Sequence, residues 1–293
     1  MSFEEFYMKN QKKILIVPIL IFILSIIILG SQLATKGYII DRDVTLKGGI
    51  SATIHSNQEI NLDDLESQLR SEFPNSDFSV RQLSAFGSKE NIGIVIEATD
   101  LTSKQIREFI ENNLETVDIS IQEMGSGLGS SFLTETITAI LIAFVLIIIV
   151  ILIAFRKFIP SLAIILSLIL DLTATLAIIS ILGVKISSAG IAAFLMVIGY
   201  SIDTDILLTT RLIKRKMGTK YERLKGAFNT GMLMTITTLT ALTIGYFVTN
   251  SLILKQMFSI ILIALVIDII STWMMNAPIL LNHLKKHETQ ENI

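Results

Sequence analysis

Four aspartates lie inside long apolar runs of the sequence, and they are the residues best placed to do chemistry. Asp171 and Asp268 lie near the middle of two such runs, and Asp203 and Asp205 lie together in a third. An aspartate at the centre of a bilayer costs roughly 2.5–3.5 kcal/mol on insertion scales, so it is rarely retained without a role. Carboxylates that can take up and release protons or ions indicate a relay through the membrane interior. The alternative is that they are protonated or hydrogen-bonded packing residues.

The helical neighbours of these acids are also polar. Residues four apart lie on one face of a helix. The sets that share a face are Ser167, Asp171 and Thr175 in one run, and Asp268, Thr272 and Asn276 in another. Polar faces of this kind predict contacts with other helices in the interior of a bundle.

Asp203 and Asp205 are separated by about 160° around a helix, so they cannot both point at one partner. Asp203 shares a face with Gly199, and we expect it to be the most important of the four acids, with Asp171 as its companion. Asp205 lies closer to the end of its run and can instead extend towards Arg211 or the lipid headgroups. The apolar runs contain no lysine or arginine. A relay that needs a cation must therefore find it on another chain.

The elements that must position these acids are transmembrane helices. A helix needs about 20 apolar residues to cross a bilayer core of ~30 Å. Six runs meet this requirement, at 14–31, 134–155, 159–182, 187–209, 230–249 and 257–281. The first is a full-length span without a small-residue cleavage site, so it is not a signal peptide. The fifth carries Thr235, Thr237, Thr238, Thr240 and Thr243 in its interior, and we expect other helices to shield it from lipid.

Composition supports a membrane protein and excludes several other classes. Hydrophobic residues make up 51% of the chain and charged residues 17%, against about 25% charged in soluble domains. The absence of cysteine excludes a disulfide framework and a thiolate metal site, and the three histidines are too scattered to indicate a metal centre. A net charge of −2 argues against nucleic-acid binding. With no phosphate-binding loop of the Walker type either, we expect neither an enzyme nor a cofactor.

Lysine and arginine in the short flanking segments predict the orientation. They cluster before the first run, between the second and third, between the fourth and fifth, and after the sixth. The opposite loops offer only Lys185 and Lys255. The positive-inside rule therefore places an interfacial segment, 1–13, and a tail, 282–293, in the cytoplasm, and 32–133 outside. The five later spans form one bundle over 134–281.

The outer segment has the pattern of an α+β domain. Alternating or amphipathic stretches predict a strand at 44–54, a helix at 62–73, strands at 77–84 and 92–98, a helix at 103–115 and a strand at 118–123. Asn61 is placed to cap the first helix, and Thr102 with Gln105 has the spacing of a capping box. The order β-α-β-β-α-β is that of the ferredoxin-like fold.

Two groups of glycines have positional meaning. Gly125, Gly127 and Gly129 lie between the outer domain and the second span, where they form either a hinge or a passive linker. Gly48 and Gly49 lie inside the first predicted strand, where glycine indicates a bulge or a close backbone approach.

Two segments predict contact with the membrane surface. Thr219 and Glu222 have the spacing of a second capping box and indicate a short basic helix at the cytoplasmic face. Phe3, Phe6 and Tyr7 share one helical face near the N-terminus. For both segments, anchoring in the interface is the expected role.

The layout and several motifs resemble the SecD/SecF family of protein-export membrane proteins, in the RND superfamily. One span, a ferredoxin-like domain and five more spans is the layout of one RND half-transporter. The segment 197–202, which contains Gly199, Tyr200 and Ser201, is similar to the fourth-span motif of the SecF branch. The segment 46–49 resembles the D-x-x-G-G signature shared by SecD and SecF, and the glycine segment before the second span matches in position. The outer domain is short for SecD, which favours the SecF branch.

The sequence departs from the family pattern at one position. Bacterial members carry the relay acid where this chain has Thr204, whereas here Asp203 and Asp205 flank that site. This variant and the isoleucine-rich spans resemble archaeal members. Archaea lack the bacterial motor ATPase, so the resemblance leaves the source of energy open.

The resemblance implies an accessory subunit of the Sec machinery, located in the cell membrane and coupled to an ion gradient. Its implied partners are a SecD-like six-span chain, the Sec translocon, the translocating polypeptide and the lipid bilayer. Half of an exporter for lipids or hydrophobic small molecules, or a non-transporting translocon scaffold, remains as an alternative. Neutralising the buried aspartates separates a relay from a scaffold.

Overall fold

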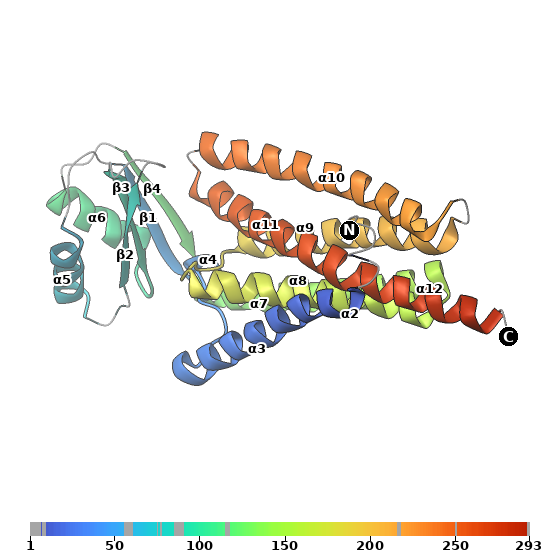
Figure 1. Cartoon of the computed structure of the whole chain (residues 1–293). Helices are drawn as coiled ribbons and strands as arrows, with labels where there is room; N and C mark the ends of the chain where they lie inside the picture. The colour runs from blue at the N-terminus through green and yellow to red at the C-terminus, as the bar shows by residue number, and fades with distance from the viewer. Residues whose placement is uncertain are drawn as a thin grey trace. The chain divides into compact units, whose positions relative to one another are not determined.

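The computed structural model of the chain describes residues 7, 10–55, 61–74, 76, 78–84, 91–114, 118–215, 218–249 and 251–291. The chain divides into two compact units. One contains the long helices of residues 1–41, 139–185 and 189–293. The other contains Arg42–Thr138 together with Ile186–Ser188, a short piece of the connection between two long helices (Figure 1).

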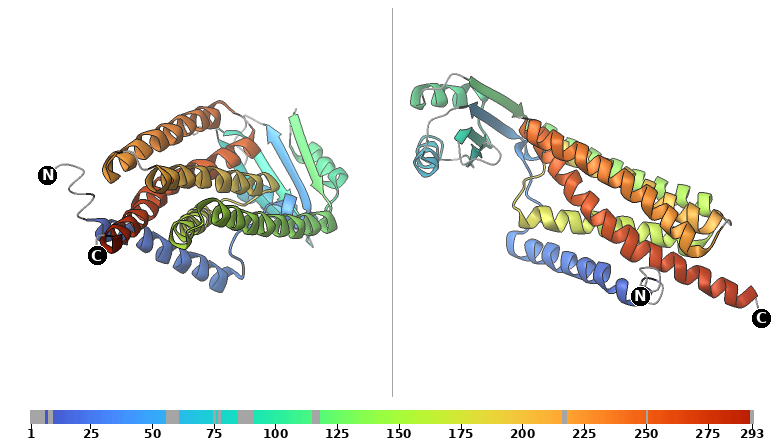
Figure 2. Two further views of the ribbon diagram at one scale, coloured as in Figure 1. Left: turned by 90° about the vertical axis from the view of Figure 1, so that its right-hand side faces the viewer. Right: turned by 45° about the horizontal axis from the view of Figure 1, so that its top comes forward.

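Six helices are long and apolar enough to cross a membrane. They are built from α2 (Gln11–Ile14) with α3 (Ile16–Lys36), α7 (Ser126–Phe155), α8 (Phe158–Ile181), α9 (Ser188–Thr209) with the π-helical turn η1 (Thr210–Lys214), α10 (Lys220–Val248), and α11 (Leu252–Ile270) with the π-helical turn η2 (Ser271–Asn276) and α12 (Ala277–Glu291). These helices confirm the six predicted spans. Two further views show α3 alongside α8 (Figure 2).

The helices α8 and α9 form the interior of the helical unit. The most apolar stretch of each is 56% buried, against 11% or less for α3, α7 and α10. Small residues early in α9, among them Gly190 and Ala193, are buried. Small side chains allow helices to approach closely, so the predicted central position of the fourth span is confirmed.

The helix α10 differs from its prediction in two ways. Thr219 caps it with Glu222, as expected, but the helix continues without a break to Val248, so a separate short surface helix is wrong. The expected shielding is also wrong for this chain by itself, because Thr235 is buried while Thr237 and Thr240 are exposed. Each of these hydroxyls donates to a backbone carbonyl one turn earlier. This hydrogen bond lowers the free-energy cost of placing the hydroxyl against an apolar surface.

The second unit is a four-stranded antiparallel sheet with two helices. The strands are β1 (Gly49–His55), β2 (Phe78–Ser84), β3 (Asn91–Ala98) and β4 (Asp118–Met124), in the order β2-β3-β1-β4. The helices α5 (Leu62–Glu72) and α6 (Ser103–Asn113) complete the predicted β-α-β-β-α-β succession. Ile50, Ile54 and Ile96 on one face of the sheet pack with Leu69 and Phe109 of the helices. The ferredoxin-like arrangement is therefore confirmed.

Local signals in this unit act as predicted. The Asn61 side chain accepts from the backbone N–H of Asp63 at 3.1 Å, which caps α5. The backbone N–H of Thr102 donates to Gln105 Oε1 at 3.0 Å, as a capping box requires.

The first predicted strand is wrong over its first residues. Val44–Lys47 form a single helical turn, α4, and β1 begins only at Gly49. Gly48 and Gly49 have φ angles of +83° and +131°, which L side chains rarely adopt. A Cβ on Gly49 would also lie 2.4 Å from the carbonyl oxygen of Ala98 on β3. Both glycines are therefore required where the chain turns into the sheet.

The segment between β4 and α7 is short. Gly125 is the single residue between Met124 at the end of β4 and Ser126 at the start of α7. Gly127 and Gly129 lie within the first helical turns of α7. A hinge at this segment would therefore act by bending at Gly125 or by unwinding the start of a helix.

A second connection ties the loop between α8 and α9 to the sheet-containing unit. Arg42 and Ile186 form an isolated parallel β-bridge, and the backbone N–H of Asp43 donates to the Ile186 carbonyl at 3.0 Å. Ile186–Ser188 therefore belong to the same compact unit as the sheet, although α9 begins at Ser188.

Candidate functional site

Three of the four predicted acids come together in the interior of the helical unit. Asp171 of α8, Asp205 of α9 and Asp268 of α11 each have 1% or less of their surface exposed. They come from three different helices and are linked by hydroxyl and amide side chains. We call Asp171, Asp205 and Asp268 the acid cluster.

Asp171 accepts a hydrogen bond on each carboxylate oxygen. The Ser201 hydroxyl of α9 donates to Oδ2 at 2.5 Å, and the Ser271 hydroxyl of η2 donates to Oδ1 at 2.5 Å. Asp171 thus connects three helices through side chains.

Asp205 is held by the last helix. The Asn276 amide donates to its Oδ1 at 2.7 Å, and the Thr272 hydroxyl approaches the same oxygen at 3.0 Å. The expected extension of Asp205 towards Arg211 or the headgroups is therefore wrong. Its side chain is fully buried because Thr272 and Asn276 face it across the bundle.

The Thr272 hydroxyl lies between two acids. It is 3.0 Å from Asp205 Oδ1 and 3.4 Å from Asp268 Oδ1. A hydroxyl has one proton to donate and can accept from a protonated carboxyl group. It can therefore donate to one of these acids while it accepts from the other, and so it joins them chemically.

The π-helical turn η2 supplies most of these donors. Ser271, Thr272 and Asn276 all belong to it and all are buried. Turns of this type occur often at functional sites. The shared face of Asp268, Thr272 and Asn276 was predicted, whereas Ser271 was not, because it lies one residue away from that face. Its i+3 spacing from Asp268 was the signal available in the sequence.

Several buried oxygens of the cluster lack a protein donor. Asp205 Oδ2 and Asp268 Oδ2 have no hydrogen-bond partner among the described residues. The buried hydroxyls of Ser167, Thr175 and Thr209, on α8 and α9, also have no hydrogen-bond partner among these residues. Among the residues that the structure describes, no lysine, arginine or histidine forms an ion pair with any of the three acids. Three ionised carboxylates are too costly to bury together without a compensating charge. The arrangement therefore favours protonated acids, since no group of described acids has the geometry to hold a metal ion.

Asp203 lies outside the acid cluster. It is exposed on α9, as the i,i+2 spacing requires once Asp205 faces inwards. It lines a hollow of about 380 Å³ with Thr210, Arg211 and Arg215. The structure therefore does not place Asp203 beside Asp171, its expected companion.

The residues of the 197–202 motif, on α9, face three different surfaces. Ser201 donates into the acid cluster, and the Tyr200 hydroxyl forms a hydrogen bond with Thr238 of α10. Gly199 is exposed, and a Cβ added there would meet nothing within 4 Å. Gly199 and Asp203 thus share an open face of α9.

Six candidate spans, a ferredoxin-like unit and a buried acid cluster define the class of a multi-pass membrane protein with a SecDF-like fold. The structure is similar to that of SecDF, a translocon-associated membrane protein from Thermus thermophilus, with a TM-score of 0.77 over 95% of this chain and 18% identity. It also matches a second SecDF structure, in a super-membrane-facing form, with a TM-score of 0.61. The chain spans 38% and 39% of those longer chains.

Sequence comparison gives the particular family. The model of the SecD/SecF C-terminal region of protein-export membrane proteins matches residues 104–286. The chain is 35% identical to the protein-export membrane protein SecF of Methanocaldococcus jannaschii, over 97% of this chain and 99% of that protein. It is 34% identical to the SecF of Methanolacinia petrolearia, over 94% and 95%. The chain belongs to the SecF protein-export membrane proteins of the SecD/SecF family, which are not enzymes.

Proposed function

We propose that this chain is an accessory subunit of the Sec machinery that promotes protein export by cycling protons or ions through the acid cluster. The observation that supports this most directly is the meeting of three buried aspartates from separate helices, with unpaired oxygens on Asp205 and Asp268. A charge that crosses the membrane potential can supply ~2.3 kcal/mol per 100 mV. Protonation of the cluster would change the hydrogen bonds that hold η2 against α8 and α9.

In this proposal the relay residues are Asp171, Asp205 and Asp268, and Asp203 acts elsewhere. The termini lie in the cytoplasm and the sheet-containing unit lies outside, as the flanking lysines and arginines predict. That unit would move on the segment 125–129 during a cycle, in contact with the translocating polypeptide.

A SecD-like chain with six spans would cover the open face of α9. Gly199 and Asp203 are exposed there, and an uncovered aspartate facing lipid is costly. Thr237 and Thr240 of α10 are also exposed. Asp203 would meet a cation or a hydrogen-bond donor of that partner at the hollow that it lines with Arg211 and Arg215.

The test compares Asp171→Asn and Asp205→Asn with Asp203→Asn in cells that depend on the variant for protein export. Asparagine keeps the shape of aspartate and removes its titration. The relay predicts that the first two variants fold, bind the partner and lose most of their export activity. Normal export by both would leave the scaffold as the function of the chain.

The partner surface can be tested separately, because the chain contains no cysteine. We expect Gly199→Cys to cross-link to the partner in native membranes, whereas Leu24→Cys, exposed on α3, does so weakly. Equal cross-linking at both positions would contradict a partner on the α9 face.

A further inference from the structure

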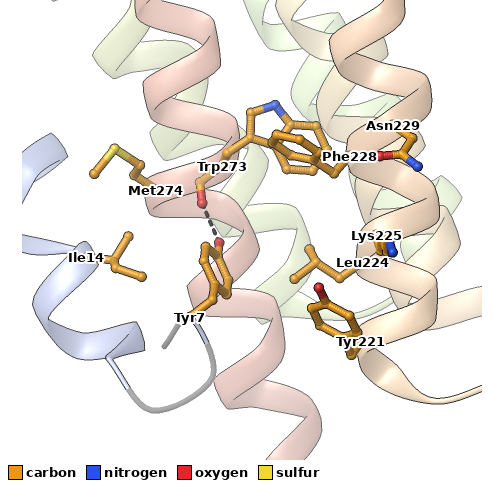
Figure 3. Close-up of a pocket in the computed structure, with 9 residues that line it drawn as sticks. All are labelled: Tyr7, Ile14, Tyr221, Leu224, Lys225, Phe228, Asn229, Trp273 and Met274. Carbon is orange, nitrogen blue, oxygen red and sulfur yellow. Dashed lines mark hydrogen bonds between the residues drawn. The ribbon is translucent and has the colours of Figure 1, made fainter. Parts of the chain in front are cut away.

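A cavity in the helical unit lies apart from the residues of the acid cluster. It has a volume of about 410 Å³ and lies between Tyr7 and Ile14, the first turns of α10 and the turn η2 (Figure 3). Tyr7, Tyr221, Lys225, Phe228, Trp273 and Met274 are among its lining residues. These side chains play no part in the proposed relay.

The deep end of the cavity is aromatic and apolar. Phe228 and Trp273 meet edge to face, with ring centroids 4.9 Å apart, at the upper end of the view in Figure 3. Met274 follows Trp273 on η2 and points to another side of that helix (Figure 3), and its flexible thioether adapts to irregular apolar ligands. The surface suits a hydrocarbon chain.

Tyr7 closes one side of the cavity. The Tyr7 hydroxyl donates to the Trp273 carbonyl at 2.5 Å. Burial raises the pKa of this hydroxyl, so it remains a protonated donor. Tyr7 is therefore held against η2 by a hydrogen bond, whereas the sequence predicts that it lies in the membrane interface. Phe3 and Phe6 lie outside the described residues.

The other end of the cavity is polar and cationic. Tyr221 and Lys225 are four residues apart and share a face at the start of α10 (Figure 3). No described acid pairs with Lys225. The nearby Arg223 is already used, because it donates to the carbonyls of Leu212 and Arg215 at 2.9 and 2.6 Å. Lys225 is therefore the cation of this cavity that remains available to a ligand.

We propose that this cavity is a binding site for an anionic phospholipid. An acyl chain would pack between Phe228, Trp273 and Met274, and the headgroup phosphate would bind Lys225 and the Tyr221 hydroxyl. Basic pockets between membrane helices recognise anionic headgroups in this way. The site also has a consequence for the acid cluster, because η2 carries Trp273 on the cavity side and Ser271, Thr272 and Asn276 on the other. Lipid in the cavity would support the turn that donates to Asp171 and Asp205.

The single tryptophan of the chain makes the site directly observable, since Trp273 is part of the cavity wall. The full chain is reconstituted in phosphatidylcholine bilayers, and tryptophan fluorescence is measured as brominated phosphatidylglycerol or brominated phosphatidylcholine is introduced at equal fractions. We expect the anionic lipid to quench with about five-fold higher apparent affinity, as one accessible lysine near a lipid surface provides.

Two variants locate the lipid. Lys225→Gln should remove the preference for phosphatidylglycerol, whereas Lys255→Gln, at the start of α11, should leave it unchanged. Met274→Phe, which fills the cavity, should reduce quenching by both lipids, with circular dichroism used to confirm folding. Equal quenching by the two lipids in the unmodified chain would reduce the site to ordinary lipid contact and overturn the proposal. So would a preference that survives Lys225→Gln, or an absence of quenching, which would indicate that protein fills the cavity.

Discussion

Glu97 in the sheet and Asp205 in the helical unit are both buried carboxylates, and the structure gives them different partners. Glu97 forms an ion pair with Arg81 of the neighbouring strand. Asp205 is bound by an amide and a hydroxyl, without a cation among the described residues. The charge of a buried carboxylate beside a guanidinium is compensated by that cation. A carboxylate held only by neutral donors can take up or release a proton or an ion with much smaller rearrangement.

The same contrast extends to the backbone. The sheet is fixed by close approaches such as that of Gly49 to Ala98, which leave no room for change. The acid cluster is assembled by side chains from α8, α9 and η2, whose hydroxyl protons can be redirected without moving a helix. We infer that the sheet-containing unit is built for rigidity and the helical unit for exchange, and the following predictions test this contrast.

The largest effect is expected where the exchange is proposed to occur. Thr272→Val keeps the shape of the side chain but removes the hydroxyl between Asp205 and Asp268. We expect most of the export activity to be lost, while unfolding stability falls by only about 1 kcal/mol, the usual net value of one hydrogen bond. Export is measured by complementation and stability by thermal unfolding in detergent. Activity lost only in proportion to the folded fraction would contradict a relay through Thr272.

The next effect concerns the rigid unit. Gly49→Ala introduces a Cβ that meets the Ala98 carbonyl at a positive φ, and we expect it to destabilise this unit by about 1–3 kcal/mol. Protease protection of the sheet-containing unit in the full chain provides the measurement. Gly30→Ala serves as the control, because it meets nothing within 4 Å and its φ is ordinary. Equal protection of the two variants would show that β1 shifts to accept a side chain.

A smaller effect is expected at the ion pair. Arg81→Leu leaves Glu97 buried without its cation, and because the Arg81 side chain is 47% exposed, the loss is about 1 kcal/mol. Replacing both residues, as Arg81→Leu with Glu97→Val, should restore much of the stability, since an apolar pair needs no compensation. Export should remain normal in the double variant if it is folded. A specific loss of export there would give the sheet a chemical role and weaken the contrast.

The smallest effect on stability is expected at the connection between the units. Gly125 has open space around it and an ordinary φ, so Gly125→Ala should change stability by less than about 1 kcal/mol. If the sheet-containing unit swings on this residue, export should nevertheless be slower. Unchanged export rates would make the segment a tether and would direct attention to the second connection, at Arg42 and Ile186.

The sequence by itself determined the elements and their order. Apolar length is a local property, so the six spans could be read from runs of residues. Alternation and capping are also local, and they predicted the β-α-β-β-α-β order together with the caps at Asn61, Thr102 and Thr219. The separation of Asp203 from Asp205 also followed, because helical geometry fixes the angle between them.

Only the tertiary structure decided which of those two acids faces inwards. Both faces of α9 carry polar and small residues, so no local pattern distinguishes the buried acid from the exposed one. The expectation that Asp203 is the most important acid therefore did not anticipate the cluster. Asp205 is buried because Thr272 and Asn276, more than sixty residues away along the chain, meet it across the bundle. The π-helical turn that brings Ser271 to Asp171 depends in the same way on packing. Contacts of this kind depend on how helices pack, which no local pattern of residues encodes.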